Sequence, residues 1–258
     1  AVSEADRQAL VELGARPERV LVTGNLKFDA RPPESGELVR RLRQAIQLAQ
    51  RGPVFVAAST MAGEEELLLP VWADIRSRHP QALWIVAPRH PARFETVAQR
   101  LARQGRSFVR RTSLEKEAER VAAQLAAAEI LLLDSIGELA GVFELADVVF
   151  VGGSLVPAGG HNVLEPAFWS KPILFGPHMA NFRDVAELFL AGDAALQVGE
   201  AAELARAVNE LLDDGARRHR MGEAAKQVLG REAGATRRTF EQFSPWLEER
   251  ASLRSVAS

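Results

Sequence analysis

The chain has 258 residues, no cysteine and a formal net charge of -2, and 47% of its residues are hydrophobic. This composition is typical of a globular protein with a sizeable core, and it excludes disulfides, thiolate catalysis and cysteine-ligated zinc. The near balance of charge argues against nucleic acid as the main partner, and no apolar run approaches the ~20 residues of a membrane-spanning helix.

Short aliphatic runs alternate with amphipathic stretches along the chain. A first helix is expected at 3–13, and the later helices are expected at 36–50, 63–78, 91–104, 137–144, 161–169, 181–191, 200–213 and 216–250. Strands are expected at 19–23, 54–59, 83–88, 107–111, 130–134, 148–152, 172–176 and 194–198. This alternation predicts an α/β fold with a doubly wound parallel, Rossmann-like sheet that helices cover on both faces.

Polar or glycine-rich segments follow six of the expected strands. These segments are "TGNLKFD", "STMAGEEE", "APRHPARF", "DSIGEL", "GGSLVPAGGHNVLEP" and "GPHMANF". In an open parallel sheet, ligands bind at the carboxyl ends of the strands. The six segments therefore predict one binding rim.

The segment "VGGSLVPAGGHNVLEP", 151–166, is the most informative of these. Gly153 and Gly160 allow sharp turns and a close approach of backbone to a ligand. We expect a helix to begin at "GGHNVLEP", with its backbone amides at a phosphate and with His161 and Glu165 on one face. The simpler interpretation is a turn, a helix cap and a surface ion pair. A zinc site is disfavoured because no third ligand is evident.

Three further loops allow both a functional and a structural interpretation. Arg89 could fork onto a phosphate or carboxylate with His90 beside it, or both could be solvated residues before Pro91. Ser59 and Thr60 offer hydroxyls, although they also precede an ordinary helix start. The segment 135–139 could contact a base or ribose, or form a simple turn. Their joint occurrence on one rim favours a nucleotide or nucleotide-sugar site.

The same segments, in the same order, closely resemble the carboxy-terminal half of the 3-deoxy-D-manno-octulosonic acid (Kdo) transferases of lipopolysaccharide synthesis. The resemblance covers most of 1–230, and "NLKFD" and "GGSLVPAGGHNVLEP" are its specific parts. It implies one lobe of an inverting GT-B glycosyltransferase that binds CMP-Kdo and transfers Kdo onto the lipid A precursor. It implies no metal and no cofactor.

The resemblance assigns donor-binding roles to matching positions. Those expected at the phosphate and carboxylate are Ser59, Thr60 and Arg89, with Lys27 completing the cationic side. The cytidine end is assigned to His90 and to the backbone of Ile136, Gly137, Glu138 and Leu139. The phosphate and ribose are assigned to Gly153, Ser154, Gly160, His161, Asn162 and Glu165.

Members of this family also have a first lobe with the membrane-associating amino terminus, the acceptor site and the catalytic base, and no such lobe precedes Ala1. The resemblance thus implies a soluble piece of a protein that works at the cytoplasmic face of the inner membrane. We expect an interlobe helix and connector over 1–18, the donor-binding domain over 19–232 and a terminal helix over 233–258. The stripe of Phe240, Phe243 and Trp246 would pack on the first lobe.

Two alternatives stay open at this point. One is a donor lobe of another GT-B enzyme or an epimerase that uses a UDP-sugar. The other is a non-catalytic interaction module whose terminal helix is the docking element. Tight binding of UDP would favour the first alternative, and the absence of any nucleotide effect would favour the second.

Overall fold

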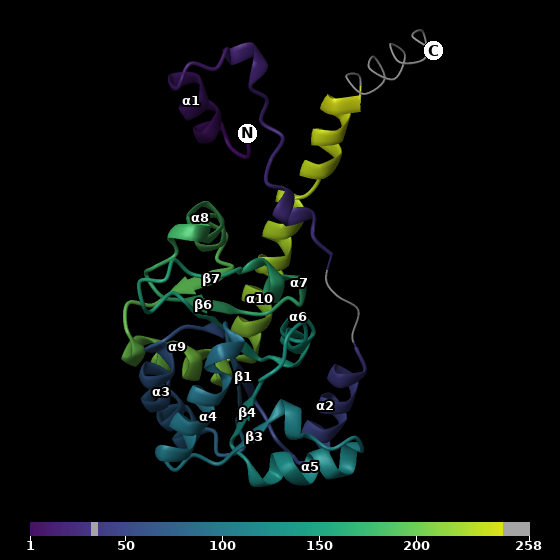
Figure 1. Ribbon diagram of the computed structural model, residues 1–258, viewed down its shortest axis with the longest axis vertical. Helices are drawn as coiled ribbons and strands as arrows, with labels where there is room; N and C mark the ends of the chain where they lie inside the picture. The colour runs from purple at the N-terminus through teal and green to yellow at the C-terminus, as the bar shows by residue number, and fades with distance from the viewer. Residues whose placement is uncertain (32–35, 245–258) are drawn as a thin grey trace. The chain divides into compact units, whose positions relative to one another are not determined.

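A computed structural model describes residues 1–31 and 36–244, and these residues divide into two compact units. The larger unit spans 32–228, and the smaller combines 1–31 with the chain from 229 onward. These boundaries fall at 31/32 and 228/229, whereas the sequence placed its own boundaries at 18/19 and 232/233. Figure 1 shows the elements of both units.

The larger unit contains a seven-stranded sheet in the order β3-β4-β2-β1-β5-β6-β7, and every neighbouring pair of strands is parallel. The strands are β1 (Val54–Thr60), β2 (Leu83–Pro88), β3 (Phe108–Arg110), β4 (Ile130–Leu132), β5 (Val148–Val151), β6 (Ile173–Phe175) and β7 (Ala195–Gln197). Aliphatic and aromatic side chains on both faces of the central strands are buried, as a sheet covered on both sides requires. The predicted doubly wound, Rossmann-like fold is confirmed.

Helices alternate with these strands along the chain. They are α2 (Glu37–Leu48), α3 (Glu64–Arg78), α4 (Phe94–Arg103), α5 (Ala118–Ala127), α6 (Leu139–Val142), α7 (Leu164–Phe168), α8 (Arg183–Ala191), α9 (Ala201–Asp213) and α10 (Gly215–Glu232). Figure 1 shows α3, α4 and α9 on one side of the sheet and α2, α5 and α6 on the other. The large core beneath α3, α4 and α9 is centred on Trp72 and Trp84, whose rings lie 5.8 Å apart.

The order of the strands fixes where a ligand can enter. From β1 the chain adds β2 on one side, then the edge strand β3, and then β4 between β2 and β3; it returns to the opposite side of β1 with β5. The order of the strands therefore reverses between β1 and β5. The crevice at the carboxyl ends of the strands at such a point is the usual binding position in this kind of sheet.

The smaller unit is held together by contacts between segments far apart in sequence. It contains α1 (Glu4–Glu12), the 3₁₀ turn η2 (Leu26–Asp29) and a helix at 235–244. The Asp29 carboxylate accepts hydrogen bonds from the backbone N–H groups of Gly234 and Thr236, both at 2.5 Å, and these bonds hold the pKa of Asp29 below its usual value. The aspartate of "NLKFD" thereby caps the helix at 235–244.

Several expectations for individual elements were wrong. The expected strand at 19–23 does not form: its backbone bonds to residue 1, to the preceding turn and to the side chains of Arg7 and Arg238, and it pairs with no strand of the described sheet. Leu21 and Val22 are 51% and 40% exposed. Helix α5 was missed, although it has an apolar face. The helical region expected at 216–250 is interrupted at 233–234, where Gly234 has a φ of +94°.

Two of the three residues of the terminal apolar stripe, Phe240 and Phe243, lie within the described residues. Phe240 and Phe243 are 64% and 61% exposed, and Trp246 lies outside the described residues. What packs on this stripe stays a prediction. Among the helices of 1–31 and 36–244, none is both long enough and apolar enough to cross a bilayer.

Candidate functional site

A buried carboxylate organises the crevice between β1 and β5. Glu64 begins α3 and is completely buried, and its two oxygens accept backbone N–H bonds from Met61 (2.8 Å), Gly153 (2.7 Å), Ser154 (3.0 Å) and Leu155 (3.0 Å). These bonds tie the loop after β5 to the first turn of α3. The amides of Gly153 and Ser154 are therefore engaged by protein and not directed at an open site.

The sequence analysis did not give Glu64 this anchoring role. The only signal for it was an acidic run directly after a strand, which is equally typical of an ordinary helix start. Close packing explains the glycines opposite: a Cβ on Gly152 would lie 2.8 Å from Glu64 Oε2 and from the Ser59 carbonyl oxygen. Only a residue without a side chain fits there.

Two of the predicted donor-binding hydroxyls are buried and bonded within the protein. Ser154 donates to the Val151 carbonyl oxygen (2.5 Å) and accepts from the Gly176 N–H (2.8 Å), which joins the ends of β5 and β6. Thr60 donates to Glu65 Oε1 at 2.6 Å. Both side chains hold strand ends in place, so a direct contact with a ligand would need these bonds to be replaced.

Three cationic or titratable side chains meet at the mouth of the crevice. His161 packs on Gly153, where a Cβ would lie 2.9 Å from the imidazole, and its Nε2 is buried without a hydrogen-bond partner in the described part of the chain. Burial and then the positive charges of Arg89 and His90 lower the pKa of His161. An unpartnered buried nitrogen near the exposed side chains of Arg89 and His90 is suited to bind an anion.

The helix after this loop begins later than expected. It starts at Leu164 and has five residues, so His161 lies before it and does not share a helical face with Glu165. That prediction was wrong, because Asn162 caps the helix: its Oδ1 accepts the Leu164 N–H at 3.1 Å and its Nδ2 donates to Glu165 Oε1 at 3.2 Å. Asn162 thus orients the Glu165 carboxylate and leaves its second oxygen for another donor.

The segment 135–139 is anchored by its own carboxylate. Arg111 donates two hydrogen bonds to Glu138, at 2.9 and 2.5 Å, and Ser135 donates a further one. Ile136 next to this anchor is 78% exposed. The end of α7 adjoins the helix after this segment, since Trp169 Nε1 donates to the Ala140 carbonyl oxygen at 2.8 Å. An exposed apolar side chain here can contact a flat base.

The remaining predicted residues have separate positions. Ser59 is half-buried at the end of β1, with the left-handed φ of +55° that is rare for a serine. Lys27 belongs to the smaller unit, so it is not assembled here with the residues of the larger one. No group of three or more metal-binding side chains occurs among the described residues.

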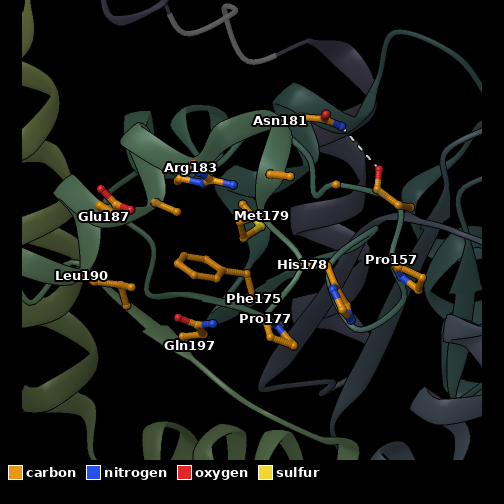
Figure 2. Close-up of a pocket in the computed structure, with 14 residues that line it drawn as sticks. Pro157, Phe175, Pro177, His178, Met179, Asn181, Arg183, Glu187, Leu190 and Gln197 are labelled. Carbon is orange, nitrogen blue, oxygen red and sulfur yellow. Dashed lines mark hydrogen bonds between the residues drawn. The ribbon is translucent and has the colours of Figure 1, made fainter. Parts of the chain in front are cut away.

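A cavity of about 550 Å³ lies on the other side of the glycine-rich loop, at the carboxyl ends of β6 and β7. Figure 2 shows the side chains of Met179, Leu190, Arg183, Glu187 and Gln197 around Phe175, and all of them line this cavity. The sequence analysis placed "GPHMANF" on the rim but assigned none of its residues to a site. The side chains of α8 that complete the cavity carried no motif.

The arrangement suits the parts of a sugar nucleotide. The imidazole of His161 with Arg89 and His90 can receive a phosphate, the free oxygen of Glu165 can accept hydrogen bonds from ribose hydroxyls, and the exposed 136–139 segment can contact a base. These groups lie at the ends of neighbouring or adjoining elements on one edge of the sheet.

Comparisons of the sequence and of the structure with known proteins find relatives of the same family. No protein-family model matches the chain. The 3-deoxy-D-manno-octulosonic acid transferase of Haemophilus influenzae is 36% identical over 92% of this chain and 54% of its own length. The crystal structure of the C-terminal CMP-Kdo binding domain of WaaA from Acinetobacter baumannii is 31% identical and covers 74% of this chain and 98% of that domain, with a TM-score of 0.64.

A more distant structure shares the fold alone. Anabaena HepE in complex with UDP-glucose is 17% identical, with a TM-score of 0.57, and the match covers 96% of this chain and 63% of that one. The chain spans about half the length of the curated relatives it matches, 54% and 56% for the first two.

Proposed function

Because this chain belongs to the 3-deoxy-D-manno-octulosonic acid transferase family, we propose that its parallel-sheet unit binds the donor CMP-Kdo. The fold is that of one lobe of a GT-B glycosyltransferase. The similar domain from Acinetobacter baumannii is described as binding CMP-Kdo, and it is matched over almost its whole length. The proposal transfers that ligand to this chain.

The observation that carries the proposal is the unpartnered imidazole of His161 at the switch point of the sheet. Its buried Nε2 lies beside Arg89 and His90, and the donor's phosphate and the carboxylate of Kdo are the anions that these side chains would bind. Glu165 would accept hydrogen bonds from the ribose hydroxyls. The cytosine would lie against the 136–139 segment, where Ile136 is exposed.

The longer protein would be an inverting Kdo transferase acting on the lipid A precursor at the cytoplasmic face of the inner membrane. The roles of the acceptor, of the membrane and of a metal-independent, cofactor-free mechanism are part of this proposal. On such a scaffold this chain would hold the leaving nucleotide, and the base that takes the acceptor's proton would come from outside it.

Thermal unfolding with CMP, with UDP and without nucleotide tests the ligand. A ligand that binds only the native state raises the apparent stability in proportion to the logarithm of its concentration over Kd. We expect CMP to raise the Tm and UDP to have a much smaller effect. A larger shift with UDP would favour a UDP-sugar enzyme, and no shift with either nucleotide would contradict donor binding.

The variant Glu165→Gln tests the predicted ribose contact. Loss of a charged hydrogen-bond partner costs about 1.5–3 kcal/mol, so CMP binding should weaken by roughly ten- to a hundredfold in calorimetric titration. The matched control is Glu119→Gln, an exposed glutamate at the start of α5. It should bind CMP like the unaltered chain. An unchanged affinity for CMP in Glu165→Gln would show that Glu165 does not contact the ribose and only accepts the hydrogen bond from Asn162.

A further inference from the structure

Another cavity lies between α3 and α4 and contains no residue of the glycine-rich loop. Its volume of about 540 Å³ is within the range of small-molecule pockets. Its lining residues come from the first two turns of α3, from one face of α4 and from the turn that follows α4. None of them is among the residues assigned to the donor, and none lines the cavity in Figure 2.

Three arginines line this cavity because of the way α4 ends. Arg100 and Arg103 are three residues apart and share a face of the helix. Gly105 then has a φ of +65°, and the N–H of Arg106 donates back to the Leu101 carbonyl oxygen at 3.0 Å. This turn, which favours glycine, returns the chain toward the helix and brings Arg106 to the same cavity.

The positive charge of these arginines is only partly neutralised. Arg100 pairs with Glu66, which joins α4 to α3. Arg103 is exposed, and no carboxylate within 1–31 and 36–244 lies within ion-pairing distance of its guanidinium. Three guanidinium groups and one carboxylate thus line the cavity, which leaves an excess of two positive charges.

Arg106 has no close negative partner either. Its Nη1 is 3.9 Å from Glu129 Oε1, and its Nε is buried without a hydrogen-bond partner in the described part of the chain. Glu129 is held more closely by Trp72 Nε1, at 3.1 Å, and by Arg76 Nη1, at 3.2 Å. Buried donors are normally satisfied. A bound anion would give this guanidinium, which is 27% exposed, the close partner that Glu129 does not provide.

Helix electrostatics explain only part of this arrangement. Arginines in the last turn of a helix interact favourably with its carbonyl end, and this accounts for Arg100 and Arg103. It does not account for Arg106, which lies beyond the helix. The cavity also has an apolar wall, with Leu69 and Pro70 from α3. Binding sites for small molecules combine such a wall with a few polar groups.

We propose that the cavity between α3 and α4 binds a small molecule with two linked phosphate groups, such as a nucleoside diphosphate. Arg103 and Arg106 each present a planar fork of donors, and two linked phosphates can occupy both forks. Arg100, oriented by Glu66, adds positive charge beside them. The organic part of the ligand would lie against the apolar wall. This inference goes beyond donor binding and does not depend on it.

The test is calorimetric titration of the unaltered chain at physiological ionic strength, with and without CMP. The probes are pyrophosphate, orthophosphate and ADP. We expect pyrophosphate and ADP to bind, and orthophosphate to bind at least about tenfold more weakly because it occupies only one fork. In NMR, pyrophosphate should shift the amide signals of Arg103, Gln104 and Arg106.

Arginine variants provide the comparison. Arg103→Gln should weaken binding of pyrophosphate at least about tenfold, because a charged hydrogen-bond donor is lost. Arg106→Lys keeps the charge but loses the planar fork, so it should weaken binding several-fold. The matched control, Arg78→Gln, removes the same charge from an exposed position in the last turn of α3 that does not line the cavity. It should leave the affinity unchanged, and amide spectra without ligand report the folding of all three variants.

Three results would contradict the proposal. The first is that neither pyrophosphate nor ADP shifts the amides of α4. The second is that Arg103→Gln folds and binds pyrophosphate like the unaltered chain, or that orthophosphate binds as tightly as pyrophosphate. The third is that phosphatidylglycerol vesicles bind in an Arg103-dependent way while both diphosphates fail to bind, which would make this surface a site for lipid headgroups.

The two proposals are tested separately by these titrations. If CMP binds but pyrophosphate does not, the donor function stands and the diphosphate site is rejected. If pyrophosphate binds in an Arg103-dependent way but CMP does not bind, the diphosphate site is supported and the proposed function is contradicted.

Discussion

At the scale of single residues, Glu64 determines the shape of the crevice although it touches no open surface. Its carboxylate accepts four backbone N–H bonds from 2.7 to 3.0 Å. In Glu64→Gln an amide donor would face two of these N–H groups. Because hydrogen bonds to a charged group contribute about 1.5–3 kcal/mol, we expect the free energy of unfolding in urea to fall by at least about 2 kcal/mol.

The neighbouring glutamate gives a matched control for this prediction. Glu66 lies two residues along α3, is exposed and pairs with Arg100 on the surface. Exposed ion pairs contribute about 0–1 kcal/mol, so Glu66→Gln should change stability little. Equal losses in the free energy of unfolding for Glu64→Gln and Glu66→Gln would show that the four N–H bonds to Glu64 contribute no more to stability than an exposed ion pair.

His161 gives the ligand-free protein a defined response to pH. Its pKa is lowered from 6.5 by burial and then by the charges of Arg89 and His90, so the folded state binds a proton less readily than the unfolded chain. This histidine therefore favours folding above the unfolded pKa, and the contribution is lost as the pH falls below 6.5 toward the folded value. We expect His161→Gln to lose less stability than the unaltered chain over that interval.

Bound CMP should reverse this dependence. A phosphate next to His161 favours the protonated imidazole and raises its pKa. The affinity for CMP should then increase as the pH falls toward about 6, and it should do so less in His161→Gln, which retains the titration of the phosphate itself. If the affinity for CMP depends on pH in the same way in the unaltered chain and in His161→Gln, the phosphate does not bind next to His161.

At the scale of elements, the end of β4 is anchored by arginines that need not touch the ligand. Arg111 holds Glu138 with two hydrogen bonds, and Arg110 donates to Asp134 at 2.6 Å. Burial acts to raise the pKa of Asp134, but hydrogen bonds from Thr112 and Arg110 hold it below its usual value. The segment 135–139 thus depends on the strand beside it for its position.

The variant Arg111→Ala tests this dependence. We expect faster hydrogen exchange at the amides of 136–139 and a CMP affinity several-fold lower, because an unanchored loop must be ordered when it binds. Arg120→Ala on α5 is the control, since Arg120 is 68% exposed and pairs only with surface glutamates. A normal CMP affinity with faster exchange would show that the base does not contact this segment.

At the scale of the whole molecule, we expect the chain to bind the donor without completing the transfer. The carboxylates near the crevice are already engaged: Glu64 by backbone amides, Glu65 by Thr60 and Arg93, and Glu138 by Arg111. A general base must be free to accept the acceptor's proton. The proposed function takes that base from outside this chain, which matches 54% of the length of the Haemophilus influenzae relative.

The assay supplies CMP-Kdo, generated in the reaction mixture, and a lipid A precursor. Product formed by this chain is compared with product formed by the full-length relative from Haemophilus influenzae, of which the chain matches 54%. We expect the chain to give no product above background. A comparable rate would contradict this expectation and would direct attention to Glu165, whose carboxylate accepts a hydrogen bond from Asn162 on one of its oxygens.

The sequence by itself determined the class of fold and placed five of the six polar segments after strands that form; the sixth, "TGNLKFD", follows the run at 19–23, which is not a strand. Alternating apolar runs and amphipathic stretches predict a parallel sheet because hydrophobic periodicity reports which side chains are buried, and this is a local property. The run at 19–23 shows the limit of that reasoning. It has the composition of a strand, but a strand also needs a sheet edge, and none accepts it in the described chain.

Only the tertiary structure decided which polar residues face a ligand and which hold the rim together. The sequence analysis assigned Ser154 and Thr60 to the donor together with His161 and Arg89, yet Ser154 and Thr60, like Glu64, are buried and bonded within the protein. The partners of these side chains lie up to 91 residues away. Hydrogen bonds over such separations depend on how strands are ordered in the sheet, and no local pattern contains that order.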